Sequence, residues 1–104
     1  MKAETSPVDL FPEKRLDDLA DLYRMFADTT RVRLLYLLSQ GELSVNELAH
    51  RLSMSQSAVS HQLRQLRIAK LVRTRREGRT IYYSLADSHV EALLHVGLEH
   101  VSEP

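Results

Sequence analysis

The stretch that decides the fold is residues 44–66, which read SVNELAHRLSMSQSAVSHQLRQL. Ser44 and Glu47 have the spacing of a capping box, in which the serine hydroxyl accepts a hydrogen bond from the main-chain amide three residues on and the glutamate reaches back to the serine amide. Apolar residues then recur at helical spacing. This pattern predicts a short helix over residues 45–52.

A second short helix is expected a few residues after the first. Ser55 is a residue type that favours a helix N-cap. A helix over residues 56–69 would place Val59, Leu63 and Leu66 on one face. Only a tight turn separates the two helices, and two short helices joined in this way are typical of a helix-turn-helix.

The segments on both sides of this motif also have clear patterns. Further helices are predicted at about 13–27, 30–40 and 88–102. Gly41 ends the second of these, and Asp87 is suited to capping the last. The segments LVRTRR and TIYYSL are rich in β-branched and aromatic residues and lie on either side of Gly78, so they predict a β-hairpin.

The expected order of elements is therefore α-α-α-α-β-β-α. This is a mainly α fold with a small β-hairpin (α+β), a winged helix-turn-helix with an additional terminal helix. Residues 1–12 contain two prolines and no periodicity, which indicates a flexible N-terminal arm. Residues 13–104 are expected to form one winged-helix domain for DNA binding and dimerisation. A partner subunit would help so small a domain to bury apolar surface.

The charges are balanced but unevenly distributed. There are 14 Lys and Arg residues and 14 Asp and Glu residues. Residues 51–79 hold eight basic residues and one acidic residue, whereas residues 1–28 hold four basic and seven acidic residues. A localised basic surface favours a polyanionic partner.

Several classes of protein are disfavoured. The chain has no cysteine, so thiolate chemistry is excluded. It has no apolar run long enough to span a bilayer and no secretory signal at its N-terminus. No Ser-His-acid or paired-carboxylate arrangement indicates an enzyme. We therefore expect a cytoplasmic protein with no membrane partner.

The exposed face of the helix over residues 56–69 suits the major groove of DNA. Gln and Ser side chains can bond base edges, while Arg side chains and helix-end amides hold phosphates. The basic hairpin would reach neighbouring phosphates. The predicted DNA-contacting residues are Gln56, Ser57, Ser60, His61, Arg64, Arg67, Arg75, Arg76 and Arg79. For the helix alone, an ordinary amphipathic helix with a solvated face is the alternative.

The run SMSQSAVSHQLRQLRIAKLVRTRREGRTIYYSL resembles the recognition helix and wing of the ArsR/SmtB family of winged-helix repressors. The resemblance extends over nearly the whole chain after residue 15. It implies a homodimer formed through the first and last helices that binds an imperfect inverted repeat in operator DNA. It also implies that an inducer releases the DNA.

The last predicted helix carries a second group of residues, Asp87, His89, His100 and Glu103. Carboxylate and imidazole ligands suit Zn²⁺. His89 and His100 are about 16 Å apart along a helix, too far for one ion, but eleven residues are close to three turns and so place both on one stripe. If this helix packs antiparallel against its symmetry mate, His89 lies beside the partner's His100. Twofold symmetry then gives two four-ligand sites per dimer.

The family resemblance points to the same four residues. They match the C-terminal-helix site of the family's zinc sensors, which implies Zn²⁺ as the cofactor with Co²⁺ as the alternative metal. It also implies a relay from the ring of His100 to a main-chain carbonyl near Lys70.

Two other functions remain open at this point. One is a family member without metal control, whose last helix serves only dimerisation. The other is a metalloenzyme or metal-buffering protein. That function would leave the exposed polar and basic face of the helix over residues 56–69 without an explanation. Water in place of Glu103 is also compatible with the site, because this residue is the penultimate one.

Overall fold

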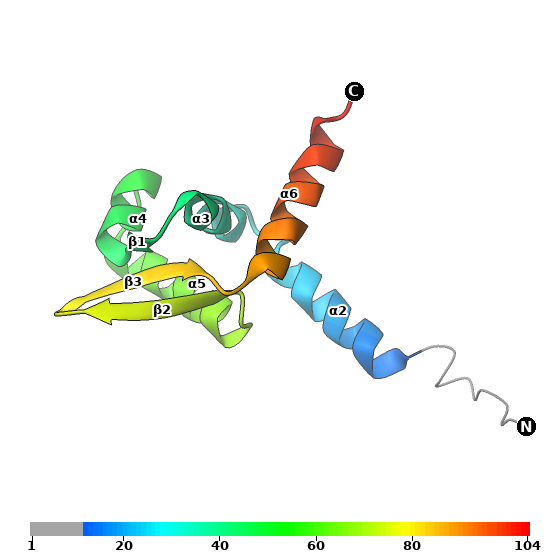
Figure 1. The fold of residues 1–104 in the computed structure, drawn as a ribbon, viewed down its shortest axis with the longest axis horizontal. Coiled ribbons are helices and arrows are strands. Elements are labelled where there is room, and N and C mark those ends of the chain that lie inside the picture. The colour runs from blue at the N-terminus through cyan, green and yellow to red at the C-terminus, as the bar shows by residue number, and fades with distance from the viewer. Residues whose placement is uncertain (1–11) are drawn as a thin grey trace, which may run out of the picture.

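The structure is a computed structural model that describes residues 12–104 (Figure 1). The arm expected over residues 1–12 therefore lies almost wholly outside the described residues. The elements of the described part are α2 (Glu13–Met25), α3 (Thr29–Gln40), β1 (Leu43–Ser44), α4 (Val45–Leu52), α5 (Gln56–Ile68), β2 (Val72–Glu77), β3 (Thr80–Leu85) and α6 (Ser88–Ser102). The predicted winged helix-turn-helix and its order of helices and hairpin strands are confirmed. Strand β1 is an addition that the sequence did not predict.

The helix starts are determined locally by the capping residues. Ser44 and Glu47 form the predicted capping box, with the Glu47 amide donating to Ser44 Oγ at 3.2 Å and the Ser44 amide donating to Glu47 Oε1 at 2.9 Å. Ser55 Oγ accepts from the amide of Ala58 at 3.1 Å. Ser53 has a left-handed backbone (φ 53°), which ends α4 and makes the turn toward α5. These capping contacts determine the residues at which both helices of the motif begin.

The core lies where α3, α4 and α5 meet. Its largest fully buried side chains are Leu34, Leu35, Leu48, Leu63, Leu66 and Val59. α3 crosses the centre of the domain, as its apolar composition predicted, but it is not buried on every side because Tyr36 is 45% exposed. Burying such side chains supplies most of the stability of a domain of this kind.

The wing is a three-stranded antiparallel sheet in the order β1-β3-β2. The hairpin strands pair from Val72 with Leu85 to Glu77 with Thr80, and Gly78 (φ 62°) makes the turn. β1 pairs with the other edge of β3, where Leu43 lies opposite Tyr83. Because β1 runs directly into α4, the sheet is continuous with the helix-turn-helix (Figure 1).

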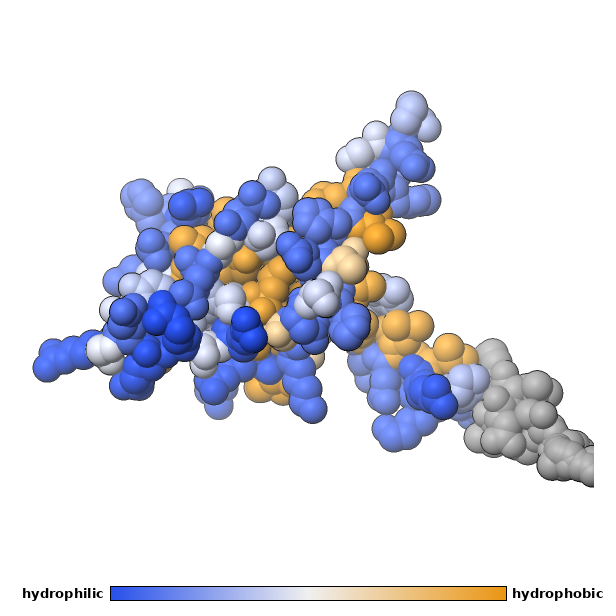
Figure 2. All heavy atoms as spheres, viewed as in Figure 1, coloured by the Kyte–Doolittle hydropathy of each residue, from blue (hydrophilic) through white to orange (hydrophobic). Residues whose placement is uncertain are grey.

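The first and last described helices project away from this body (Figure 1). α2 has no buried residue, and in α6 only Val90 and Leu94 are buried. Figure 2 shows apolar atoms along both helices, in the angle between them. Their exposed large apolar residues are Leu16, Leu19, Tyr23, Val96, Leu98 and Val101. No helix among residues 12–104 is long and apolar enough to cross a membrane.

Candidate DNA interface and metal-binding residues

One side of α5 is buried and the other is presented to solvent. Val59, Leu63 and Leu66 are fully buried and hold the helix against the core. The structure places all six predicted α5 residues on the exposed side: Gln56, Ser57, Ser60, His61, Arg64 and Arg67. Because no acidic residue lies on this helix, its exposed face combines neutral polar and basic side chains.

A groove of about 310 Å³ lies between the N-terminal ends of α4 and α5 and the wing. From α5 it is lined by Gln56 and Ser60, and from the wing by Arg79, Thr80 and Ile81. Recognition helix and wing tip therefore share one surface. Asn46 of α4 also lines the groove, and sequence analysis did not predict it, because the groove joins segments that are distant along the chain.

Two of the predicted wing arginines point freely into solvent. Arg76 and Arg79 are exposed, and neither makes an ion pair or a side-chain hydrogen bond within residues 12–104. Both are therefore available to an anion.

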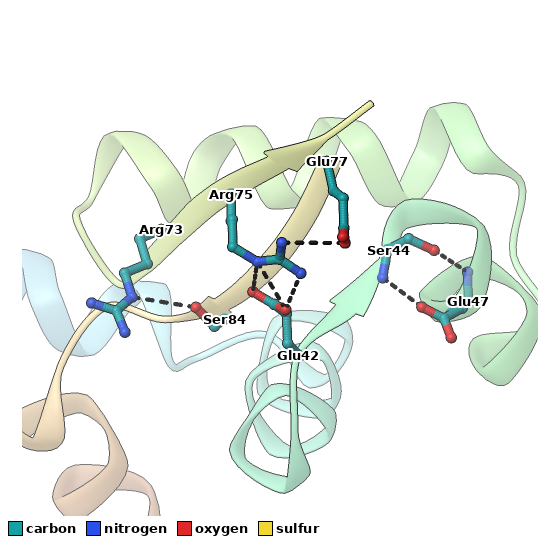
Figure 3. Close-up of polar contacts among 7 residues, drawn as sticks. All are labelled: Glu42, Ser44, Glu47, Arg73, Arg75, Glu77 and Ser84. Atoms are coloured by element: carbon teal, nitrogen blue, oxygen red, sulfur yellow. Dashed lines mark hydrogen bonds and ion pairs between the residues drawn. The ribbon is translucent and has the colours of Figure 1, made fainter. Parts of the chain in front are cut away.

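Arg75 has a different environment (Figure 3). Its Nε donates to both carboxylate oxygens of Glu42, at 3.1 and 3.2 Å, and Nη2 donates to Glu42 Oε1 at 2.8 Å. Nη1 donates to Glu77 Oε1 at 3.3 Å. The guanidinium carbon also lies 4.9 Å from the centroid of the Tyr82 ring, within the range of a cation–π interaction. The predicted DNA-contacting arginine is thus held by the protein itself.

This contact changes how both groups titrate. The hydrogen bonds from Arg75 lower the pKa of the Glu42 carboxyl, and the hydrogen bonds to Glu42 and Glu77 raise the pKa of the Arg75 guanidinium. Because the pKa of Glu42 is depressed in the folded state, the pair is present above the ordinary glutamate pKa and is lost as the pH falls through the folded value.

We expect an NMR titration of the side-chain carboxyl to show Glu42 protonating at a lower pH than the ordinary glutamate range, because its pKa is lowered by the hydrogen bonds from Arg75. In Arg75→Met the titration of Glu42 should move up to the ordinary range, because the hydrogen-bond donors are lost. An unchanged titration of Glu42 in the variant would contradict the contact.

The four predicted metal ligands lie at the two ends of α6. Asp87 caps the helix through Oδ1, which accepts from the amides of His89 and Val90 at 3.0 and 3.1 Å. Oδ2 makes no hydrogen bond within the described residues, and His89 Nδ1 lies 3.7 Å from Oδ1. The structure therefore brings Asp87 and His89 together, with the His89 side chain 91% exposed.

His100 and Glu103 are exposed at the opposite end, away from that pair. Within residues 12–104 of one chain, no group of three or more His, Cys, Asp or Glu residues is positioned to hold a metal ion. One carboxylate and one imidazole at each end fit half of a tetrahedral zinc shell. His95, on another side of α6, has its Nε2 3.9 Å from Glu91 Oε2.

Comparison with known proteins identifies the family. Residues 28–74 match the bacterial regulatory protein arsR family. The HTH-type transcriptional regulator KmtR of Mycobacterium tuberculosis is 44% identical over 94 residues, which are 90% of this chain and 72% of that protein. The transcriptional repressor SmtB homolog of Synechocystis sp. is 47% identical over 85 residues, which are 82% of this chain and 64% of that protein.

A solved structure with a similar fold points to the same family. It is the homodimeric winged helix-turn-helix DNA-binding domain of Mb0332 from Mycobacterium bovis, a possible ArsR-family transcriptional regulator. It is 29% identical, has a TM-score of 0.85, and the match covers 99% of this chain and 92% of that one. The winged helix-turn-helix, the family match and these relatives together show that this chain belongs to the ArsR family of DNA-binding transcriptional regulators, which are not enzymes.

Proposed function

We propose that the protein is a repressor that binds operator DNA as a homodimer and releases it when Zn²⁺ binds between the subunits. The observation that carries this proposal is the position of the donors on α6. Asp87 and His89 lie at one end, and His100 and Glu103 lie at the other, on a helix whose outer side remains apolar and exposed.

The DNA-binding part of the proposal uses the surface formed by α5 and the wing. α5 enters the major groove, where Gln56, Ser57, Ser60 and His61 approach base edges. Arg64 and Arg67 of α5 and Arg76 and Arg79 of the wing bind phosphates. A twofold dimer presents two such surfaces, so the operator is an imperfect inverted repeat.

The dimer forms through the two projecting helices. Exposed apolar residues of α2 recur at helical spacing, at Leu16, Leu19 and Tyr23. On α6, Leu93 and Val96 lie on the stripe that joins His89 to His100. A cleft of about 290 Å³ between the end of α2 and α6 is lined by apolar residues, including Phe26 and Val101. A second copy would cover this surface, which is costly to leave in water.

The metal part of the proposal follows from an antiparallel arrangement of two α6 helices. Asp87 and His89 of one subunit then meet the partner's donors from the far end of its α6, which completes two shells per dimer. When bound, Zn²⁺ would supply a rigid four-coordinate link between the subunits. Asp87 fits this role because its Oδ1 is used by the helix cap, while its Oδ2 accepts no hydrogen bond from residues 12–104.

Metal and DNA are expected to oppose each other through the geometry of the dimer. The two α5 helices must lie about 34 Å apart to enter successive major grooves. A link that fixes the α6 pair in another arrangement weakens DNA binding, and by linkage DNA weakens metal binding by the same factor.

The test is a gel shift on the DNA upstream of the protein's own gene, with and without zinc. We expect the metal-free protein to retard this DNA, zinc to release it, and a chelator to restore the complex. Isothermal titration should give about two zinc ions per dimer. DNA binding that zinc leaves unchanged, with no tight zinc binding, would support the alternative of a family member without metal control.

A further inference from the structure

We propose that Arg75 is a positioning residue: through Glu42 it ties the wing to the helix-turn-helix, and the wing's phosphate contacts come from Arg76 and Arg79. This inference rests on the DNA-binding part of the proposed function. It assigns different roles to two arginines that are adjacent in the sequence and were predicted to act alike.

The contact crosses the whole width of the sheet. Arg75 lies on β2, which is one edge, and Glu42 immediately precedes β1, which is the other edge. Between them lies Tyr82 of β3, which pairs with Arg75 on one side and with Ser44 on the other. The guanidinium lies over the ring of Tyr82, 4.9 Å from its centroid. From there it reaches the Glu42 carboxylate, as Figure 3 shows for the Arg75–Glu42 contact.

The acidic end of the contact belongs to the segment that starts the helix-turn-helix. Glu42 lies two residues before Ser44, which is both the last residue of β1 and the N-cap of α4. A movement of the wing would therefore also move Glu42 and the start of α4. The short turn between α4 and α5 would pass this movement on to α5. This geometry holds the wing at one angle to the recognition helix.

The same contact keeps Arg75 from a phosphate. Three of its nitrogens already donate to carboxylates, and such charge-assisted hydrogen bonds are the strong ones in proteins. If Arg75 turned to DNA, it would leave Glu42 unpaired in a basic surface that faces a polyanion. Arg76 has no such partner within the described residues, and as its neighbour on a strand it points to the opposite face of the sheet.

Matched variants separate the two roles. Arg75→Met and Arg76→Met remove the same charge from neighbouring positions, and their operator affinity is measured between about 50 and 200 mM salt. A lost phosphate contact makes the slope of log affinity against log salt about 0.9 less steep. Raising the salt from about 50 to 200 mM then lowers the affinity of the variant by a factor about 3.5-fold smaller than the factor for the wild type. We expect this change for Arg76→Met.

For Arg75→Met we expect an unchanged salt slope with operator affinity about threefold to fivefold lower at every salt concentration, because an exposed ion pair is lost and the wing is held less firmly. A slope lowered by about 0.9 would show that Arg75 binds a phosphate and would overturn the proposal.

Exchanging the two charges gives a second, opposite readout. Glu42→Arg combined with Arg75→Glu keeps the net charge and restores an ion pair, whereas Arg75→Glu alone places two acids together. If the two residues act as an ion pair, the double variant binds the operator better than the summed effects of Glu42→Arg alone and Arg75→Glu alone predict. If Arg75 is a phosphate ligand, the effects of the two single variants add, because the added charge of Glu42→Arg then acts independently.

A measurement without DNA separates failure of this inference from failure of the proposed function. Amide hydrogen exchange of Leu43 and Tyr83, which lie opposite each other in the β1–β3 pairing, should be faster in Arg75→Met and as slow as wild type in Arg76→Met. Equal exchange in both variants would overturn the tie. If the wild-type protein bound the operator with no salt dependence, the DNA-binding proposal itself would fail.

Discussion

Replacing Val96 by glutamate is expected to convert the protein to a monomer and to weaken operator binding by at least about a hundredfold. Val96 is 63% exposed in the single chain and lies near the middle of the α6 stripe. In an antiparallel pair with His89 beside the partner's His100, this position meets the partner's Leu93. The variant therefore places a carboxylate in an apolar contact twice per dimer, which is costly because a buried charge has no partner there.

The loss of affinity follows from bivalency. A dimer binds two half-sites, and once one subunit is bound the second binds at a high effective concentration, which raises the affinity about 10²- to 10⁴-fold over one subunit. Sedimentation velocity and a gel shift measure the two effects. His95→Glu is the matched control, because it adds the same charge to a side of α6 that faces away from the stripe, and it should remain dimeric. A monomeric His95→Glu variant or a dimeric Val96→Glu variant would contradict the proposed interface.

Replacing His100 by alanine is expected to abolish release of the operator by zinc while leaving binding by the metal-free protein intact. Loss of a residue that only supports a ligand costs about 10- to 100-fold in metal affinity, so loss of a ligand itself should exceed about a hundredfold. DNA binding should persist because His100 lies in the last turn of α6. That end of the helix projects away from α5 and the wing (Figure 1).

The measurements are a zinc competition titration and a gel shift over a range of zinc concentrations. His95→Ala removes an imidazole from the same helix but outside the predicted ligand set, and it should respond to zinc as the wild type does. His89→Ala should behave like His100→Ala, since each shell needs both histidines. Release of DNA by zinc from His100→Ala, at the wild-type concentration, would show that the sensing site is elsewhere or that His100 is not its ligand.

Much of the fold was predictable because its signals are local. The capping box at Ser44 and Glu47, the cap at Ser55 and the turn at Gly78 each lie within a few residues of the structure that they determine. Strand β1 was not predictable in the same way, since two residues are too few to show a period. Its pairing with β3 joins residues about forty positions apart in the chain, such as Leu43 and Tyr83.

The candidate DNA surface was predictable in composition but not in the role of each side chain. The exposed face of α5 followed from helical periodicity, which fixes which residues share a face. The environment of Arg75 did not follow, because its main partner, Glu42, lies 33 residues away in sequence. The alternation of a strand shows that Arg75 and Arg76 point to opposite faces of the sheet. It cannot show which of the two has a carboxylate within hydrogen-bonding distance.

The direct passage from β1 into α4 has a consequence for protein engineering. Since Ser44 ends a strand and starts a helix with no intervening loop, the hairpin is not an independent module that can be transplanted by exchanging residues 72–85 alone. A chimera that takes its hairpin from another regulator would also have to take residues 42–44. Otherwise the new hairpin would pair with the original residues 42–44, which contact residues of the original hairpin.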